Sequence, residues 1–136
     1  MPVRPQASTP HLSTKLQLSL TRVESGLPLA SMAAFLEASG VALRDIYDVV
    51  IPARTLKHRR AQRSPLSPDE SDKLARLARI FDQAVVVFGD TERARNWLTQ
   101  PKKRFENRTP LNMLRTEIGG RLVEEMLGQI DEGMFA

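Results

Sequence analysis

The sequence has no cysteine among its 136 residues, only two histidines, and no apolar run long enough to cross a membrane. Without cysteine the chain forms neither disulfide bonds nor thiolate metal sites, and His11 and His58 alone do not supply the three clustered ligands that a metal ion needs. The first residues also lack the charged-then-apolar layout of a signal peptide. We therefore expect a protein of the reducing cytoplasm that holds no metal and no cofactor.

Catalytic groups are also scarce, and those present do not form a recognisable set. No Ser-His-acid arrangement is suggested by order or context. Adjacent acids such as Glu124 and Glu125 point in different directions on a helix. The Gly119-Gly120 pair follows no strand and lacks the longer phosphate-binding motif, so close helix packing is the better interpretation. The sequence favours a binding protein and not an enzyme.

Apolar residues recur at steps of three and four through most of the chain, which is typical of amphipathic helices. One predicted helix runs from Leu12 to Gly26, and a second opens at Pro28 and ends before Gly40. No strand-like alternation interrupts this pattern. With 41% hydrophobic residues, the chain can bury one sizeable core, so we expect an all-α protein of one domain or of two tightly joined units.

Two short predicted helices lie on either side of a break at Ile51 and Pro52. The first carries an apolar face around Ile46, and the second, over residues 53–62, has Leu56 as its inward anchor. Two short helices joined by so tight a turn, the second of them strongly basic, are typical of a helix-turn-helix unit. The sequence therefore predicts a helix-turn-helix at residues 12–66, preceded by a disordered arm at residues 1–11.

Positive charge is concentrated in this half of the chain. Residues 1–66 carry nine Lys/Arg against four Asp/Glu, a balance of +5, whereas residues 67–136 carry eleven against twelve, a balance of −1. A basic stretch can simply be a solvated face, but five cations beside a tight helical turn favour contact with DNA phosphates and bases. The candidate DNA-binding residues are Arg54, Thr55, Lys57, His58, Arg59, Arg60 and Arg63.

A long helix is predicted to connect the two halves. Ser67 followed by Pro68, with Glu70 three residues after the serine, is the pattern of a capping box, and the apolar spacing continues to Gly89. Its wide apolar face predicts burial on several sides. We expect residues 67–89 to form a connecting helix and residues 90–136 to form a small C-terminal helical domain.

The C-terminal domain has the most distinctive spacing in the chain. Thr109-Pro110 and Thr116 are predicted helix starts, and Trp97 is predicted to anchor the core, although a lone tryptophan can also be an interface residue. The last predicted helix has its apolar face at Ile118, Leu122, Val123, Met126, Leu127 and Ile130. After Gly133 the chain ends in an apolar Met-Phe-Ala tail, which either covers its own core or is held by another protein.

These residues resemble a known family, the toxin-binding domain of the Xre/MbcA/ParS antitoxins. The resemblance covers the C-terminal third and is carried by Trp97, Leu98, Pro101, Arg108, Thr109, Pro110, Leu111, Leu114, Thr116, Gly119, Val123, Leu127, Ile130, Gly133 and Phe135. Where the family usually has glycine before Arg-Thr-Pro, this chain has Glu106-Asn107; asparagine tolerates positive φ better than most residues. The resemblance implies that the partner of this protein is a RES-domain toxin, which uses NAD. It also implies that the protein represses its own operon.

The charge of the last helix agrees with that implication. Residues 117–136 contain five acids and one base, and an acidic helix with an apolar end suits a cationic cleft such as one that binds dinucleotide phosphates. The resemblance implies that this end reaches the toxin's active site. The candidate toxin-binding residues are Ile130, Asp131, Glu132, Gly133, Met134, Phe135 and Ala136.

The sequence thus predicts an antitoxin that occludes the NAD site of a RES-domain toxin and binds promoter DNA, as a homodimer because operator half-sites are usually read in pairs. One alternative is a stand-alone helix-turn-helix regulator whose C-terminal half dimerises or senses a ligand. Another is a protein adaptor with a degenerate helix-turn-helix.

Overall fold

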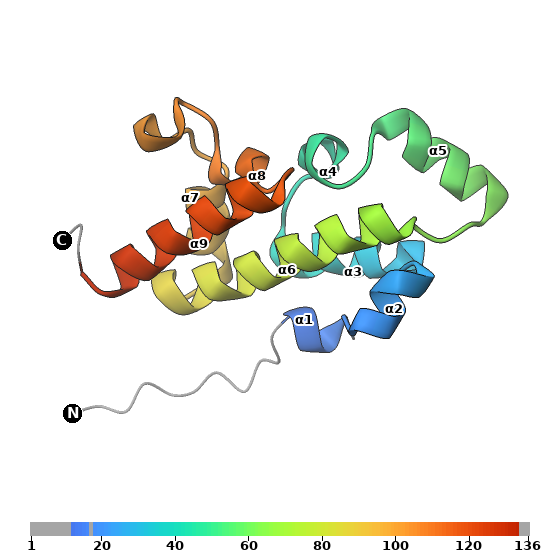
Figure 1. Ribbon diagram of the computed structural model, residues 1–136, viewed down its shortest axis with the longest axis horizontal. Helices are drawn as coiled ribbons and strands as arrows, with labels where there is room; N and C mark the ends of the chain where they lie inside the picture. The colour runs from blue at the N-terminus through green and yellow to red at the C-terminus, as the bar shows by residue number, and fades with distance from the viewer. Residues whose placement is uncertain (1–11, 17, 134–136) are drawn as a thin grey trace.

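The computed structural model describes residues 12–16 and 18–133, and the regular structure of these residues is helical apart from one isolated β-bridge (Figure 1). The elements in chain order are α1 (Leu12–Lys15), α2 (Leu20–Ser25), α3 (Leu29–Ser39), α4 (Leu43–Val49), α5 (Ala53–Gln62), α6 (Pro68–Phe88), α7 (Thr91–Leu98), the 3-10 helix η1 (Lys103–Phe105), α8 (Pro110–Met113) and α9 (Glu117–Asp131). The predicted all-α class is confirmed. The predicted arm at residues 1–11 lies outside the described residues.

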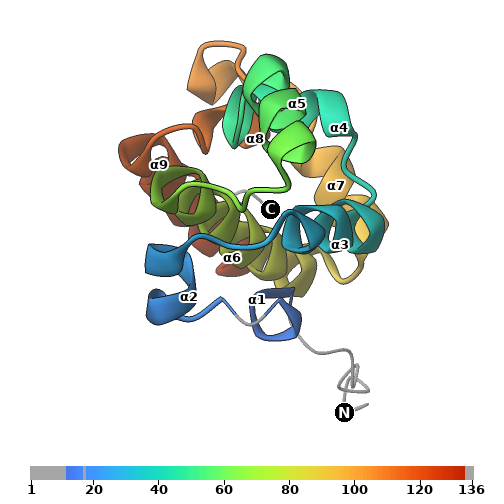
Figure 2. The ribbon, with the colours of Figure 1, turned by 90° about the vertical axis from the view of Figure 1, so that its right-hand side faces the viewer.

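Helix α6 is the element around which the others pack. Its capping box is present: the Ser67 hydroxyl accepts from the Glu70 backbone N–H at 3.1 Å, and the Glu70 carboxylate accepts from the Ser67 N–H at 2.8 Å. Gly89 ends the helix in the left-handed conformation, with φ of 93°. Figure 2, which looks along the molecule, shows the other helices surrounding α6. Because α6 packs against α1, α2 and α3 as well as α7 and α9, both halves share one core.

The N-terminal helix predicted from Leu12 to Gly26 is wrong, because the chain forms two short helices there. Asp82 of α6 accepts from the backbone N–H groups of Leu12 and Ser13, at 2.7 and 3.0 Å, and so fixes the start of α1. Ser19 begins α2 by accepting from the Arg22 N–H. The packing of α1 on α6 and the Ser19 cap of α2 together outweigh the helical periodicity that runs through α1 and α2.

The C-terminal helices begin at the predicted caps. The Thr109 hydroxyl accepts from the Asn112 N–H, and the Thr116 hydroxyl accepts from the Gly119 N–H, each at 3.0 Å. Close packing at the glycine pair is also confirmed: a Cβ at Gly119 would collide with the Met113 carbonyl oxygen, and one at Gly120 would press on the Arg76 side chain. These glycines let α9 approach α8 and α6 more closely than any larger residue would allow.

The predicted apolar face of α9 is only partly buried. Val123 and Leu127 are fully buried, but Ile118 is 76% exposed and Leu122 is 43% exposed. At about 100° per residue, Ile118 and Leu122 lie roughly a third of a turn away from the buried side. These two residues therefore lie outside the core, although they belong to the apolar pattern of the helix. Among the described residues, no helix is both long and apolar enough to span a membrane.

Candidate DNA-binding and partner-binding surfaces

The unit formed by α4 and α5 has the predicted helix-turn-helix layout. Helix α4 ends at Val50, whose N–H donates to the Ile46 carbonyl at 2.8 Å, and α5 begins directly after Pro52. Val49, Val50 and Ile51 are all buried, so the turn is held from inside by apolar packing. The turn therefore fixes the direction in which α5 leaves the core (Figure 1).

Helix α5 is fastened to the rest of the protein at two points. Of its ten residues, all of them described, only Leu56 is buried, at 1% exposure. The second point is Arg59, whose guanidinium donates to both carboxylate oxygens of Glu70, at 3.1 and 3.3 Å. Because Glu70 also belongs to the capping box, one carboxylate joins the basic helix to the start of α6.

The environment of Glu70 keeps this carboxylate ionised. Burial alone raises the pKa of the Glu70 carboxyl, but the hydrogen bonds from Arg59 and Ser67, together with the charge of Arg59, outweigh burial and lower the pKa below its usual value. The ion pair between Arg59 and Glu70 is therefore complete at neutral pH.

The remaining candidate DNA-binding residues lie on the surface. Arg54, Lys57, His58, Arg60 and Arg63 are exposed, and Thr55 is half-buried. Since Leu56 and Arg59 face inward, the rotation of the helix places Arg54 and Lys57 on the opposite, outward side. The structure thus brings all but Arg59 of the candidate cations to the surface, and it gives Arg59 a structural contact that the sequence did not indicate. The role of each residue in DNA contact stays a prediction.

A second candidate surface is the outward side of α9. Ile118, Leu122 and Glu125 follow one another at steps of four and three, so they share one side of the helix, and all three are exposed. Glu117 and Arg121 form an ion pair of 3.0 Å beside them. Exposed apolar residues that run into exposed acids along one helix are typical of a protein-binding surface. The sequence showed Ile118 and Leu122 only as apolar residues of a helix, and this spacing did not indicate that they are exposed.

The candidate toxin-binding residues at the end of α9 are placed only in part. Asp131, Glu132 and Gly133 are exposed, and Ile130 is partly buried against the core. Gly133 has a positive φ of 79°, so the chain turns there after the helix ends. Met134, Phe135 and Ala136 lie outside the described residues. The described part of this segment is therefore a partly buried isoleucine followed by an exposed acidic end.

Trp97 lies between the core and the surface. Its ring packs against Phe88, with centroids 5.4 Å apart, and it is partly buried, which agrees with its predicted role as an anchor. The Lys102 ammonium lies 5.2 Å from the same ring, close enough for a cation–π contact. Burial lowers the pKa of the Lys102 ammonium. Trp97 therefore also positions the loop that follows α7.

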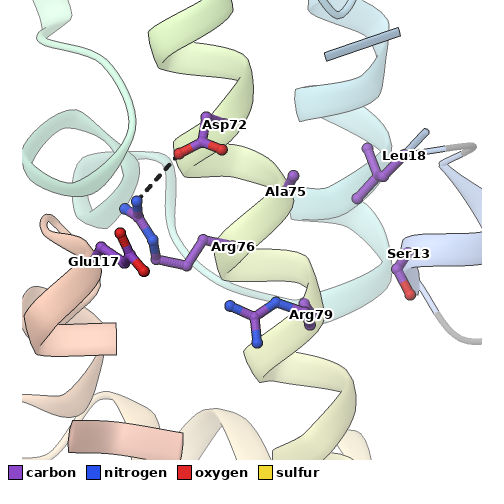
Figure 3. Close-up of a pocket in the computed structure, with 7 residues that line it drawn as sticks. All are labelled: Ser13, Leu18, Asp72, Ala75, Arg76, Arg79 and Glu117. Carbon is purple, nitrogen blue, oxygen red and sulfur yellow. Dashed lines mark hydrogen bonds and ion pairs between the residues drawn. The ribbon is translucent and has the colours of Figure 1, made fainter. Parts of the chain in front are cut away.

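A cleft of about 410 Å³ lies along α6, and its lining is shown in Figure 3. Arg76 donates to Asp72 and to the Leu114 carbonyl, at 3.2 and 3.0 Å, and so holds α6 against the segment between α8 and α9. The Ser13 hydroxyl donates to Asp82, and Arg79 pairs with Glu124. These polar groups join α1, α6 and α9 to one another. The cleft is therefore a seam between helices.

Two protein-family models match the chain, and the boundary between the two matches falls within α6. The "Antitoxin Xre-like helix-turn-helix domain" matches residues 19–79, and the "Antitoxin Xre/MbcA/ParS C-terminal toxin-binding domain" matches residues 83–133. The two matches meet within the continuous helix α6, and the domain boundaries expected from the sequence stay predictions. Both matched domains are binding modules, in agreement with the expectation that the chain is not an enzyme.

Curated proteins similar to this chain are antitoxins. Antitoxin Xre of Pseudomonas putida is 43% identical over 124 residues, which cover 91% of this chain and 77% of that protein. Antitoxin Xre of Photorhabdus laumondii is 31% identical over 134 residues, covering 97% and 86%. The Prs ADP-ribosylating antitoxin of a Sphingobium species is 27% identical over 124 residues, covering 84% and 78%. The chain therefore belongs to the Xre family of antitoxins, with an N-terminal helix-turn-helix domain and a C-terminal toxin-binding domain.

Proposed function

We propose that this antitoxin neutralises a RES-domain toxin by placing the C-terminal end of α9, and the residues after it, in the toxin's NAD-binding cleft. The observation that carries this proposal is the exposed acidic end of α9 at Asp131 and Glu132, on the domain that matches a toxin-binding family. A cleft that binds the phosphates of NAD is cationic, so an acidic helix end complements it. One relative is named an ADP-ribosylating antitoxin, and ADP-ribosylation is a reaction that draws on NAD.

The outward side of α9 supplies the rest of the toxin contact. Ile118 and Leu122 lie toward the start of the helix, about 20 Å and about 13 Å from its end at 1.5 Å per residue, so a toxin that holds both regions covers most of the helix. Burying exposed apolar side chains stabilises a complex by about 1.5–3 kcal/mol for each large residue. Apolar contacts then supply affinity, while the acidic end directs α9 to the cleft.

The helix-turn-helix carries the second activity, repression of the antitoxin's own operon. Helix α5 enters the major groove with Arg54 and Lys57 on its outward side, and His58 and Arg60 flank them. We propose that the protein binds its operator as a homodimer, because paired recognition helices read half-sites about 34 Å apart. Helix α5 then reads bases while the flanking cations bind phosphates.

Co-expression with the toxin tests the neutralising mechanism. Reversing charge with Asp131→Lys and Glu132→Lys should abolish rescue of growth, because the acidic end would then repel a cationic cleft. Glu37→Lys, at an exposed position on α3, is the matched control and should rescue as the wild type does. Full rescue by the doubly reversed variant would rule out the acidic end as the blocking element.

A further inference from the structure

A second basic cluster lies in the toxin-binding half, in the loop between α7 and α8. This basic loop, residues 102–108, contains four cations and one acid: Lys102, Lys103, Arg104, Arg108 and Glu106. Lys103, Arg104 and Arg108 are exposed, and the ion pair between Arg108 and Glu106 is long, at 3.8 Å, with both side chains mostly in solvent. The loop therefore presents a net positive charge at the surface of a domain whose last helix is acidic.

The backbone of the basic loop is fixed. The Lys102 N–H donates to the Arg108 carbonyl at 3.1 Å, and the Asn107 N–H donates back to the Lys102 carbonyl at 2.9 Å. Phe105 is buried beneath the loop. Glu106 and Asn107 both have positive φ, 57° and 66°, a conformation that asparagine tolerates but that glutamate adopts only where its surroundings hold it. Cations on a fixed backbone lose less conformational entropy on binding than cations on a flexible one.

The position of the basic loop relates it to α5. In Figure 1 the loop and α5 project on the same side of α6, with α4 between them, and Figure 2 shows both above α6 when the molecule is viewed along its length. The loop shares its sign of charge with α5 and opposes that of the α9 end. A cationic toxin cleft would repel the loop, whereas a DNA duplex held by α5 would attract it.

We propose that the basic loop is a second DNA contact, in which Lys103, Arg104 and Arg108 bind backbone phosphates beside the stretch that α5 reads. The proposal rests on the DNA-binding role of α5 and extends it to the toxin-binding domain. Contacts to phosphates carry no sequence information, so the loop adds affinity and fixes orientation on the duplex. It also makes DNA and toxin neighbours on the same C-terminal domain.

The test is the salt dependence of DNA binding by the full-length protein with two of the loop cations replaced, Lys103→Gln and Arg104→Gln. Each lost phosphate contact reduces the slope of log K against log salt by about 0.9, so the slope should become shallower by about 1.8 for each protomer, or about 3.6 for a homodimer on its operator. The affinity should fall equally on operator and unrelated duplexes. Arg93→Gln, which removes an exposed cation of α7 in the same domain, is the matched control and should leave the slope unchanged.

A second arm uses the length of the DNA. Extending a duplex beyond the bases that α5 covers should raise the affinity of the wild type and not that of the loop variant. An unchanged slope in the loop variant overturns the proposal, and loss of toxin affinity with an unchanged slope assigns the loop to the toxin instead.

A third variant, Arg54→Gln with Lys57→Gln, separates the two hypotheses, because failure of that variant to weaken operator binding contradicts the role of α5 and not that of the loop.

Discussion

Helices α5 and α9 both lie at the surface, but they differ in whether the chain itself covers their large apolar residues. Helix α5 buries Leu56 and has most of its cations at the surface, so the rest of the chain covers its one large apolar residue. Helix α9 buries Val123 and Leu127 yet leaves Ile118 and Leu122 in solvent. The difference teaches that helical periodicity shows which residues share a side, and that only the packing shows whether the same chain or another protein covers that side.

The largest expected effect concerns the single apolar anchor of α5. Leu56→Ala should lower the free energy of unfolding by about 3 kcal/mol, because it removes buried methyl groups and leaves a cavity. Chemical denaturation followed by circular dichroism measures this loss. Ile118→Ala, which removes a similar side chain from an exposed site on α9, should leave the free energy of unfolding nearly unchanged. Equal losses in the two variants would contradict the contrast between the helices.

The reverse pattern is expected for binding of the toxin. Ile118→Asp should weaken toxin affinity about 100-fold, or about 2.7 kcal/mol, because it places a charge in an apolar contact. Leu20→Asp on α2 is a closely matched control, since Leu20 is 75% exposed and Ile118 is 76% exposed. Calorimetric titration with the toxin should show no change for Leu20→Asp. If both variants bind as the wild type does, α9 contacts the toxin elsewhere.

The ion pair below α5 should have a moderate and pH-dependent effect. Glu70→Gln should lower the free energy of unfolding by about 2 kcal/mol, since it weakens the capping box and leaves Arg59 without its carboxylate. The folded-state pKa of Glu70 lies below its unfolded value, so this stability is present above the usual value of 4.5 and is lost as the pH falls through the lowered one. Thermal melting at pH 7 and pH 3 should show a gap between wild type and variant that narrows at pH 3.

Asp69→Asn is the control for that measurement. Asp69 lies in the same first turn of α6 and pairs with Lys73, but its side chain is 78% exposed. Its replacement should cost only a few tenths of a kcal/mol, as is usual for exposed ion pairs. If Glu70→Gln at pH 7 destabilises the protein as little as Asp69→Asn does, then the ion pair between Arg59 and Glu70 does not hold α5 against α6.

The smallest expected effect is a gain in stability at the basic loop. Glu106→Gly should raise the free energy of unfolding by about 0.5 kcal/mol, because glycine adopts the left-handed conformation without the steric cost borne by glutamate. Glu106→Ala removes the same charge but keeps the steric cost, and it should give no gain. A loss of stability in the glycine variant would mean that the loop backbone is not held as described.

Patterns formed by residues close together in the sequence predicted most of the helices. The capping groups of Ser67, Thr109 and Thr116 lie within three residues of the N–H groups that they accept from, so the sequence alone was enough to recognise them. The burial of Leu56 could also be predicted locally, because it is the one strongly apolar residue in a basic helix.

The features that sequence reasoning missed depend on contacts between distant residues. Asp82 caps α1 from 70 positions away, and Arg59 reaches Glu70 across the turn between α5 and α6. Neither partner is marked by local periodicity. The exposure of Ile118 and Leu122 was missed because apolar residues at helical spacing look the same in the sequence whether or not the chain covers them.

The most direct test of the central claim is calorimetric titration of the toxin–antitoxin complex with a non-hydrolysable NAD analogue. The complex with the full-length antitoxin should bind no analogue, because in the proposed mechanism the end of α9 and the residues after it fill the cleft. A complex with an antitoxin that ends at Gln129 lacks both acids and the residues after them but keeps Ile118 and Leu122, and it should recover the affinity of the free toxin. Binding of the analogue to the full-length complex as tightly as to the free toxin would contradict the account.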